Sequence, residues 1–167
     1  MSRSRPLANF YRSSEYCAEE SVAAVMKRTL GSMANQADVL LGPHSLTSAQ
    51  AAPLMRLKTV GLATVAEVAR WLHADAGATT RLLDRLERKG FCRRVRSGSD
   101  RRVVMVGLTP LGEEAIADAP IVFCQVMNDH LAGFSNSEWN ALKDYLLRML
   151  KNAEALRDAG PASAGGR

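Results

Sequence analysis

Several patterns that mark large classes of proteins are missing from this sequence of 167 residues. It contains no run of about 18 consecutive apolar residues, so a membrane span is not expected. The first residues lack the apolar centre that a secretion signal has. We therefore expect a soluble protein of the cytoplasm.

Cysteine and histidine are scarce, and their spacing matches no common site. The three cysteines, Cys17, Cys92 and Cys124, are widely spaced without a CxxC pair, which argues against both a disulfide scaffold and a zinc site. The three histidines are scattered, and the chain has neither a glycine-rich phosphate loop nor an HExxH motif. Neither an enzyme nor a metal or other resident cofactor is therefore expected.

The sequence does have a local excess of positive charge. The segment from Asp75 to Arg102 holds nine basic residues, eight of them arginine, and four acidic residues, so it carries the whole net charge of +5. A charged run is often only a solvated face, but arginine suits bidentate contact with phosphates and guanine edges. The segment therefore favours a polyanionic partner such as DNA.

Hydrophobic spacing predicts a mainly helical chain with one short hairpin. Thr64 with Glu67, and Ser135 with Glu138, have the spacing of capping boxes at helix starts, whereas Pro120 predicts a kink inside a helix. The predicted helices span 10–41, 47–58, 64–72, 76–89, 109–133 and 135–157, and the predicted strands span 91–95 and 103–108.

Two short helices followed by a hairpin in the middle of the chain predict a winged helix-turn-helix. We expect a flexible arm at 1–9, a helical dimerisation region formed by 10–45 and 109–157, a DNA-binding domain at 46–108 and a disordered tail at 158–167. The outer helices have apolar stripes that the central domain is too small to cover, so packing against a second copy is expected. A single helical core within one chain is the alternative.

Over roughly residues 10–157 the chain resembles the multiple antibiotic resistance regulator (MarR) family. The resemblance rests on LTSAQ at 46–50, TRLLDRLERKGF at 80–91, DRR at 100–102 and LTPLG at 108–112, in this order and spacing. It implies a mainly α, homodimeric winged-helix protein that represses genes from a palindromic operator. It also implies release from DNA by a small aromatic, anionic effector or, in one branch, by cysteine oxidation.

Helix-turn-helix geometry and the family pattern together assign DNA contacts to the recognition helix and the wing. Small residues and Arg81 in the first turns of that helix would meet base edges, with Arg85 one turn further along. In the wing, the family pattern gives Asp100 and Arg102 a structural role and places Arg101 in the minor groove. The expected DNA contacts are Gly77, Ala78, Thr79, Thr80, Arg81, Arg85, Arg94, Arg96, Ser97 and Arg101.

Four residues near the ends of the first predicted helix form a candidate effector site. Arg12 next to Tyr11 and Tyr16, with His44 nearby, offers a cation and aromatic rings to an aromatic carboxylate or a phenol. The alternative is that Tyr16 and His44 are interface residues whose polar groups are satisfied there.

Two cysteines are candidates for a redox switch. Cys17 lies close to the position of the reactive thiol in the oxidation-sensing branch of the family, and Cys92 lies at the root of the wing. Cysteines are also often inert small hydrophobic residues, and Cys124 on an apolar stripe is expected to be one.

Other functions remain open at this point. Arg85 and Arg88 have Asp84 and Glu87 as alternative ion-pair partners within the same helix. The winged helix also has an alternative use, in contacts with proteins or RNA. A basic recognition helix combined with Arg101 in the wing favours double-stranded DNA, because a protein-binding winged helix has no need of either.

Overall fold

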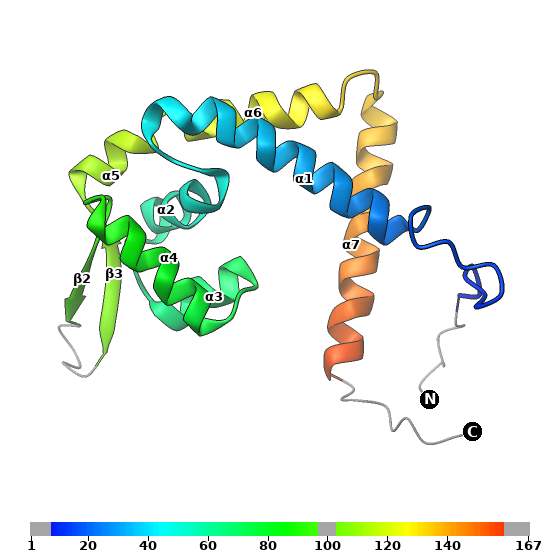
Figure 1. The fold of residues 1–167 in the computed structure, drawn as a ribbon, viewed down its shortest axis with the longest axis horizontal. Helices are drawn as coiled ribbons and strands as arrows, with labels where there is room; N and C mark the ends of the chain where they lie inside the picture. The colour runs from blue at the N-terminus through cyan, green and yellow to red at the C-terminus, as the bar shows by residue number, and fades with distance from the viewer. Residues whose placement is uncertain (1–7, 97–102, 159–167) are drawn as a thin grey trace. The chain divides into compact units, whose positions relative to one another are not determined.

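The computed structural model describes residues 8–96 and 103–158 (Figure 1). The chain divides into two compact units, Met1–Val126 and Met127–Arg167. The fold is mainly helical with one small antiparallel sheet, which is the class that the sequence predicts. In chain order the elements are α1 (Val22–Leu41), the 3-10 helix η1 (Gly42–His44), α2 (Ser48–Val60), β1 (Leu62–Thr64), α3 (Val65–Leu72), α4 (Ala76–Arg88), β2 (Cys92–Arg96), β3 (Val104–Leu108), α5 (Pro110–Ala115), α6 (Ala119–His130) and α7 (Asn136–Asp158).

Helix α1 begins at Val22, so the predicted start near residue 10 is wrong. The buried Ser21 hydroxyl accepts a hydrogen bond from the Ala24 amide at 3.2 Å, and the Tyr11 hydroxyl accepts one from the Val22 amide at 2.9 Å. Side chains thus satisfy amides that a first helical turn leaves without backbone partners. The preceding residues form turns rather than another stretch of helix.

Both predicted capping boxes are confirmed. The Thr64 amide donates to the Glu67 carboxylate at 2.7 Å, and the Glu67 amide donates back to the Thr64 hydroxyl at 3.2 Å. The Ser135 amide donates to Glu138 at 2.8 Å, and the Glu138 amide donates back to Ser135. Each pair therefore fixes the first turn of its helix, α3 in the first unit and α7 in the second.

The sheet has three strands in the order β1-β3-β2, all antiparallel. The predicted hairpin is present as β2 and β3, and Leu62–Thr64, for which no strand was predicted, forms a third strand. Ala63 and Arg94 flank Val106 from the two sides, and Val106 is fully buried. A strand of three residues is too short for periodicity to reveal, because its pairing with β3 is what makes it a strand.

The helix predicted over 109–133 is interrupted close to the expected kink. α5 ends at Ala115 and α6 begins at Ala119, just before Pro120. Proline has no amide hydrogen to continue the helix, and its ring clashes with the carbonyl one turn earlier. Here that carbonyl belongs to Ile116 and accepts from the Ala119 amide at 3.1 Å instead.

One hydrophobic core holds the first unit together. It joins the inner faces of α2, α3 and α4 to the sheet and to buried residues of α1, α5–α6 and their connections. Its fully buried large side chains include Leu41, Leu54, Leu57, Val68, Leu83, Leu86, Val106, Ile116 and Val126. This core places α4 on a fixed base, with its opposite face in solvent.

Candidate nucleic-acid interface

Helix α4 begins at a well-formed N-cap. The Asp75 carboxylate accepts a hydrogen bond from the Ala78 amide at 2.8 Å, and this bond holds the pKa of Asp75 below its usual value. The first turn beyond the cap presents Gly77 and Thr80 to solvent, with Ala78 half-buried. The N-terminal turns of α4 are thus accessible, as a recognition helix requires.

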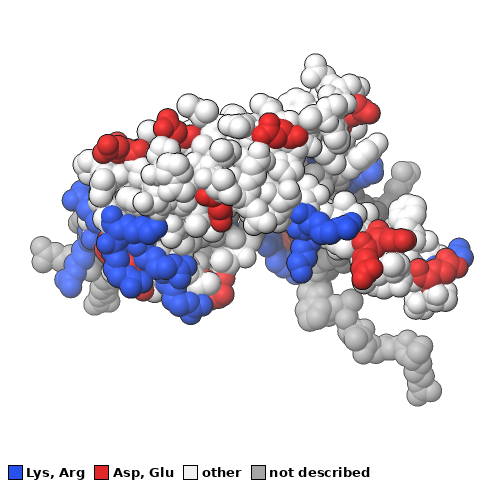
Figure 2. All heavy atoms as spheres, turned by 45° about the horizontal axis from the view of Figure 1, so that its top comes forward, with Lys and Arg blue, Asp and Glu red and all other residues white. Residues whose placement is uncertain are grey.

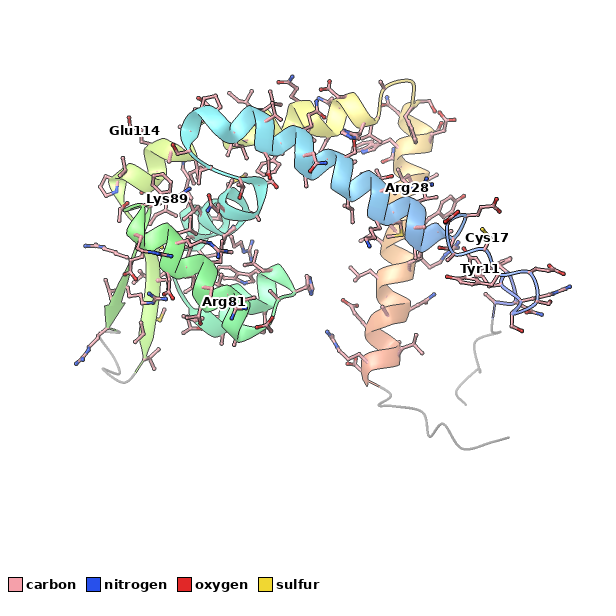
Figure 3. All side chains as sticks on the ribbon, viewed as in Figure 1. Tyr11, Cys17, Arg28, Arg81, Lys89 and Glu114 are labelled. Carbon is pink, nitrogen blue, oxygen red and sulfur yellow. The ribbon has the colours of Figure 1, made fainter. Side chains whose placement is uncertain are left out.

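Arg81 and Arg85 are exposed and lie one turn apart on α4. A Cβ atom added at Gly77 would lie 3.5 Å from Nη1 of Arg81 and 3.2 Å from the Asp75 carboxylate. The Arg81 side chain therefore runs back over the bare backbone of Gly77 toward the start of the helix, where Figure 3 labels it. This places its guanidinium beside the turn expected to meet base edges.

Thr79 does not belong to the exposed set, so its predicted base contact is wrong. Its side chain is 1% exposed, and its hydroxyl donates to the Asp75 carbonyl at 2.9 Å. Leu83 and Leu86 share this buried face of α4. The spacing of Thr79, Leu83 and Leu86 is that of one helical face, so the sequence already contained the signal for this position.

Arg94 is also placed differently from the prediction. Its Nη2 lies 2.6 Å from Oδ1 of Asp84, its Nη1 2.5 Å from Oε2 of Glu87, and its amide donates to Oε1 of Glu87 at 3.0 Å. The hydrogen bond to Asp84, together with the charge and hydrogen bond of Glu87, raises the pKa of Arg94 above its already high normal value. Arg94 therefore ties β2 to α4 and is not a free phosphate contact.

The basic residues left in solvent on β2 are Arg93 and Arg96. Figure 2 shows Lys and Arg side chains gathered over the region of α4 and the sheet. Arg93 was not predicted as a contact, although its exposure follows from the alternation of side chains along a strand whose neighbour Cys92 is buried. Ser97, Asp100, Arg101 and Arg102 lie outside the described residues.

The four candidate effector residues do not form one site within a chain. Tyr11 and Tyr16 are in edge contact, with ring centroids 5.8 Å apart, and Arg12, the next residue after Tyr11, is exposed. His44 follows the other end of α1, about 30 Å of helix away, with its Nε2 3.6 Å from an Asp118 carboxylate oxygen.

The three cysteines differ in their surroundings. Cys17 and Cys124 are exposed, and Figure 3 shows Cys17 beyond the start of α1, near Tyr11. Cys92 is buried, and burial, assisted by the charge of Glu87, raises the pKa of its thiol to about 11. A thiol with that pKa is protonated at neutral pH and is therefore a poor nucleophile toward oxidants.

The described part of the chain offers neither a metal site nor a membrane-spanning helix. Within residues 8–96 and 103–158, no group of three or more His, Cys, Asp or Glu residues is placed to hold a metal ion. In the same ranges no helix is both long and apolar enough to cross a membrane.

Comparison with known proteins identifies the family. The MarR family pattern matches residues 46–104. The multiple antibiotic resistance protein MarR of Escherichia coli (strain K12) is 32% identical over 108 residues, which cover 65% of this chain and 75% of that protein. The transcriptional regulator YwoH of Bacillus subtilis, described as uncharacterized and HTH-type, is 32% identical over 117 residues, or 70% of this chain and 84% of that protein.

A solved structure gives the same result for the fold. A mutant MarR from E. coli, complexed with operator DNA, superimposes with a TM-score of 0.70 and 26% identity, covering 77% of this chain and 92% of that chain. Family membership agrees with the sequence-based prediction that the chain is not an enzyme, since the family consists of DNA-binding regulators. The chain belongs to the MarR family of winged-helix, DNA-binding transcription regulators.

Proposed function

We propose that the chain acts as a homodimeric repressor that binds a palindromic operator and leaves it when a small aromatic anion binds. The observation that carries this proposal is that α4 combines a buried inner face with an exposed, arginine-bearing first half. In the proposal, residues 46–108 form the DNA-binding domain, and 10–45 with 109–157 form the dimerisation region.

In this proposal α4 reads the major groove. The backbone would come close to the bases at Gly77, Ala78 and Thr80, and Arg81 would reach a guanine edge. The phosphates would be contacted by three further exposed arginines, Arg85, Arg93 and Arg96. Arg101, which lies outside the described residues, is proposed for the minor groove.

The dimer is supported by the apolar surface of α7. All 23 residues of this helix are at least partly exposed, and its apolar residues recur at helical spacing. Those side chains include Trp139, Leu142, Leu146, Met149 and Leu150, which are between 37% and 51% exposed. A second copy related by a two-fold axis would cover such a stripe and would present two α4 helices to half-sites about 34 Å apart.

The experiment compares two DNA duplexes. The full chain is titrated with the DNA upstream of its own gene and with a scrambled duplex of the same length and composition, between about 50 and 200 mM salt. We expect tight binding to the upstream DNA that weakens steeply with salt, and repression of transcription from a template that carries it. Equal affinity for both duplexes at every salt concentration would overturn the proposal.

The wing is tested with Arg101→Ala, and Arg157→Ala on α7 is the matched control. Loss of a minor-groove arginine is expected to weaken DNA binding strongly without a change in melting temperature or in dimer content. Arg157 is exposed near the end of α7, so its removal is expected to change neither. If Arg101→Ala unfolds the protein, Arg101 is structural and the assignment within the wing is wrong.

The effector is proposed to bind near Tyr11, Arg12 and Tyr16. Two aromatic rings in edge contact, with an exposed arginine next to one of them in the sequence, would hold a planar anion by ring contact and a charge-assisted hydrogen bond. A thermal-shift screen of aromatic carboxylates and phenols, followed by DNA release, would identify it. Compounds that release DNA equally from wild type and from Arg12→Met would place the effector site elsewhere.

Oxidation is the second regulatory candidate, and the exposure of Cys17 supports it, whereas the burial of Cys92 does not. Peroxide is expected to lower the DNA affinity of wild type and of Cys124→Ser, but not that of Cys17→Ser. Equal responses from all three proteins would exclude Cys17 as the switch.

A further inference from the structure

Lys89, the C-cap residue of α4, is exposed like the arginines of this helix, but its ammonium group has two hydrogen-bond partners in another part of the chain. Its Nζ donates to the Ser45 carbonyl at 2.6 Å and to Oε1 of Gln50 at 3.0 Å, and it lies 5.9 Å from the centroid of the Phe91 ring. Two of the three hydrogen-bond donors of the ammonium group are therefore used within the protein. Figure 3 labels Lys89, just past the C-terminal end of α4, and Arg81, in the first half of that helix.

The partners of Lys89 lie in the connection between α1 and α2 (residues 42–47) and in the first turn of α2. Gln50 belongs to the capping box of α2, and the Oε1 atom that Lys89 contacts also accepts from the Thr47 amide at 3.3 Å. Ser45 has a left-handed backbone, with φ of 57°. One ammonium group thus joins the end of α4 to the start of α2.

The same connection is fixed to α1. The Ser48 amide donates to the Asp38 carboxylate of α1 at 2.6 Å, and the Leu46 amide donates to the Leu41 carbonyl at 3.3 Å. Leu46 and Leu41 are also buried in the core. A continuous set of contacts therefore runs from α1, through the connection, to the C-terminal end of α4.

We propose that Lys89 is a positioning residue for DNA recognition: it holds α4 at a fixed place relative to α1 and so sets the half-site spacing that the protein accepts. This inference rests on the proposed function, because only a dimer has two recognition helices to space. In a two-fold dimer any shift of α4 relative to α1, which belongs to the proposed dimerisation region, appears twice in the distance between the recognition helices. Base pairs are about 3.4 Å apart, so a small shift is enough to alter spacing preference.

The probes are a duplex that the full chain selects from a random-sequence pool and two derivatives with one base pair added or removed between the half-sites. The spacing preference is the affinity for the selected duplex divided by that for each derivative. Lys89→Met removes the donors and keeps most of the alkyl chain, Lys89→Arg keeps a charged donor, and Arg88→Met removes a neighbouring exposed charge.

We expect Lys89→Met to lower the spacing preference by about threefold or more, the effect of losing one or two ordinary hydrogen bonds. Lys89→Arg and Arg88→Met are expected to keep the preference of the wild type. A general loss of stability weakens binding to all three duplexes alike, so it leaves this ratio unchanged. If Lys89→Met fails to fold, Gln50→Leu, which removes one of the two acceptors, is expected to lower the same ratio.

Two results would overturn the inference. An unchanged preference with a salt slope reduced by about 0.9 would show that Lys89 is a phosphate contact. A wild type that binds its selected duplex without any spacing preference would leave Lys89 no spacing to set. Failure to select any sequence at all would instead overturn the proposed function.

Discussion

Helices α4 and α7 use their surfaces in opposite ways. α4 has 13 residues and buries Thr79, Leu83 and Leu86, while its arginines face solvent. α7 has 23 residues, all at least partly exposed, and eight large hydrophobic side chains lie in solvent. Its charges are balanced, with four basic and four acidic residues between Asn136 and Asp158.

This difference separates two tasks. The packing of α4 is completed within one chain, so its charged face is free to meet a polyanion. Helix α7 has no net charge with which to attract DNA, and its exposed hydrophobic surface suits a protein partner. On this view the stability of α4 is independent of a second copy, whereas that of α7 depends on one.

The largest effect is expected in the core beneath α4. Leu86→Ala should destabilise the first unit by about 2–5 kcal/mol, because the substitution leaves a cavity at a fully buried position. Urea unfolding measures this loss of stability, and Leu146→Ala on α7 is measured in the same way for comparison. The loss for Leu86→Ala should not depend on protein concentration, whereas the loss for Leu146→Ala should. The same concentration dependence for both variants would remove the distinction between the helices.

The next effect concerns association. Leu146→Glu combined with Leu150→Glu places two carboxylates on the apolar stripe of α7, and burying them in an interface is costly. We expect the dimer dissociation constant to rise by about a hundredfold or more. Sedimentation velocity over a range of concentrations gives the value. The control is Lys151→Glu at an exposed position of the same helix, which makes the net charge more negative by the same amount as the two Leu→Glu substitutions.

Removal of Arg81 tests the DNA-facing surface of α4. Arg81→Ala should weaken binding to the selected duplex by about 10- to 100-fold, the usual range for an arginine that contacts a base. Lys151→Ala on α7 removes the same charge at an exposed site and should change the affinity little. Equal losses in the two variants would reduce the role of Arg81 to net charge.

Arg94 and Arg93 are neighbours on β2 with opposite expected roles. Arg94→Met should cost about 1–2 kcal/mol of unfolding free energy, because it removes hydrogen bonds to two carboxylates of α4. Arg93→Met should leave stability nearly unchanged and lower DNA affinity instead. Chemical unfolding measures the stability of the two variants, and fluorescence anisotropy measures their DNA affinity. A reversed pattern would restore Arg94 as a DNA contact.

The smallest effect is a pH dependence at the start of α4. Because the pKa of Asp75 is lower in the folded protein, its cap stabilises the helix above the unfolded pKa, and this contribution is lost as the pH falls through the folded pKa. Asp75→Asn caps a helix without titrating. As the pH falls, that variant should lose less of its free energy of unfolding than wild type, because it lacks the contribution of Asp75. Acid-unfolding curves that superimpose for the two proteins would contradict this expectation.

Local signals were enough to predict much of the fold. The capping boxes at Thr64 and Ser135, the break near Pro120 and the burial of Leu83 and Leu86 follow from residue types at short spacing. β1 could not be predicted in this way, because its pairing with β3 joins residues far apart in the chain.

The site was less predictable than the fold for the same reason. The family pattern of the wing placed Arg94 among the DNA contacts, and only the packing of β2 against α4 shows that Asp84 and Glu87 bind it. The link from Lys89 to Ser45 likewise depends on the tertiary fold. The burial of Thr79, in contrast, could have been predicted from helical spacing.

The most direct test of the whole account is the mass of the protein free in solution and bound to its selected duplex, measured by sedimentation velocity. We expect two chains in the free protein, two chains per duplex, and single chains when α7 carries Leu146→Glu and Leu150→Glu. A wild type that is a single chain when free and binds one chain per duplex would contradict the assignment of α4 to DNA and α7 to a second copy.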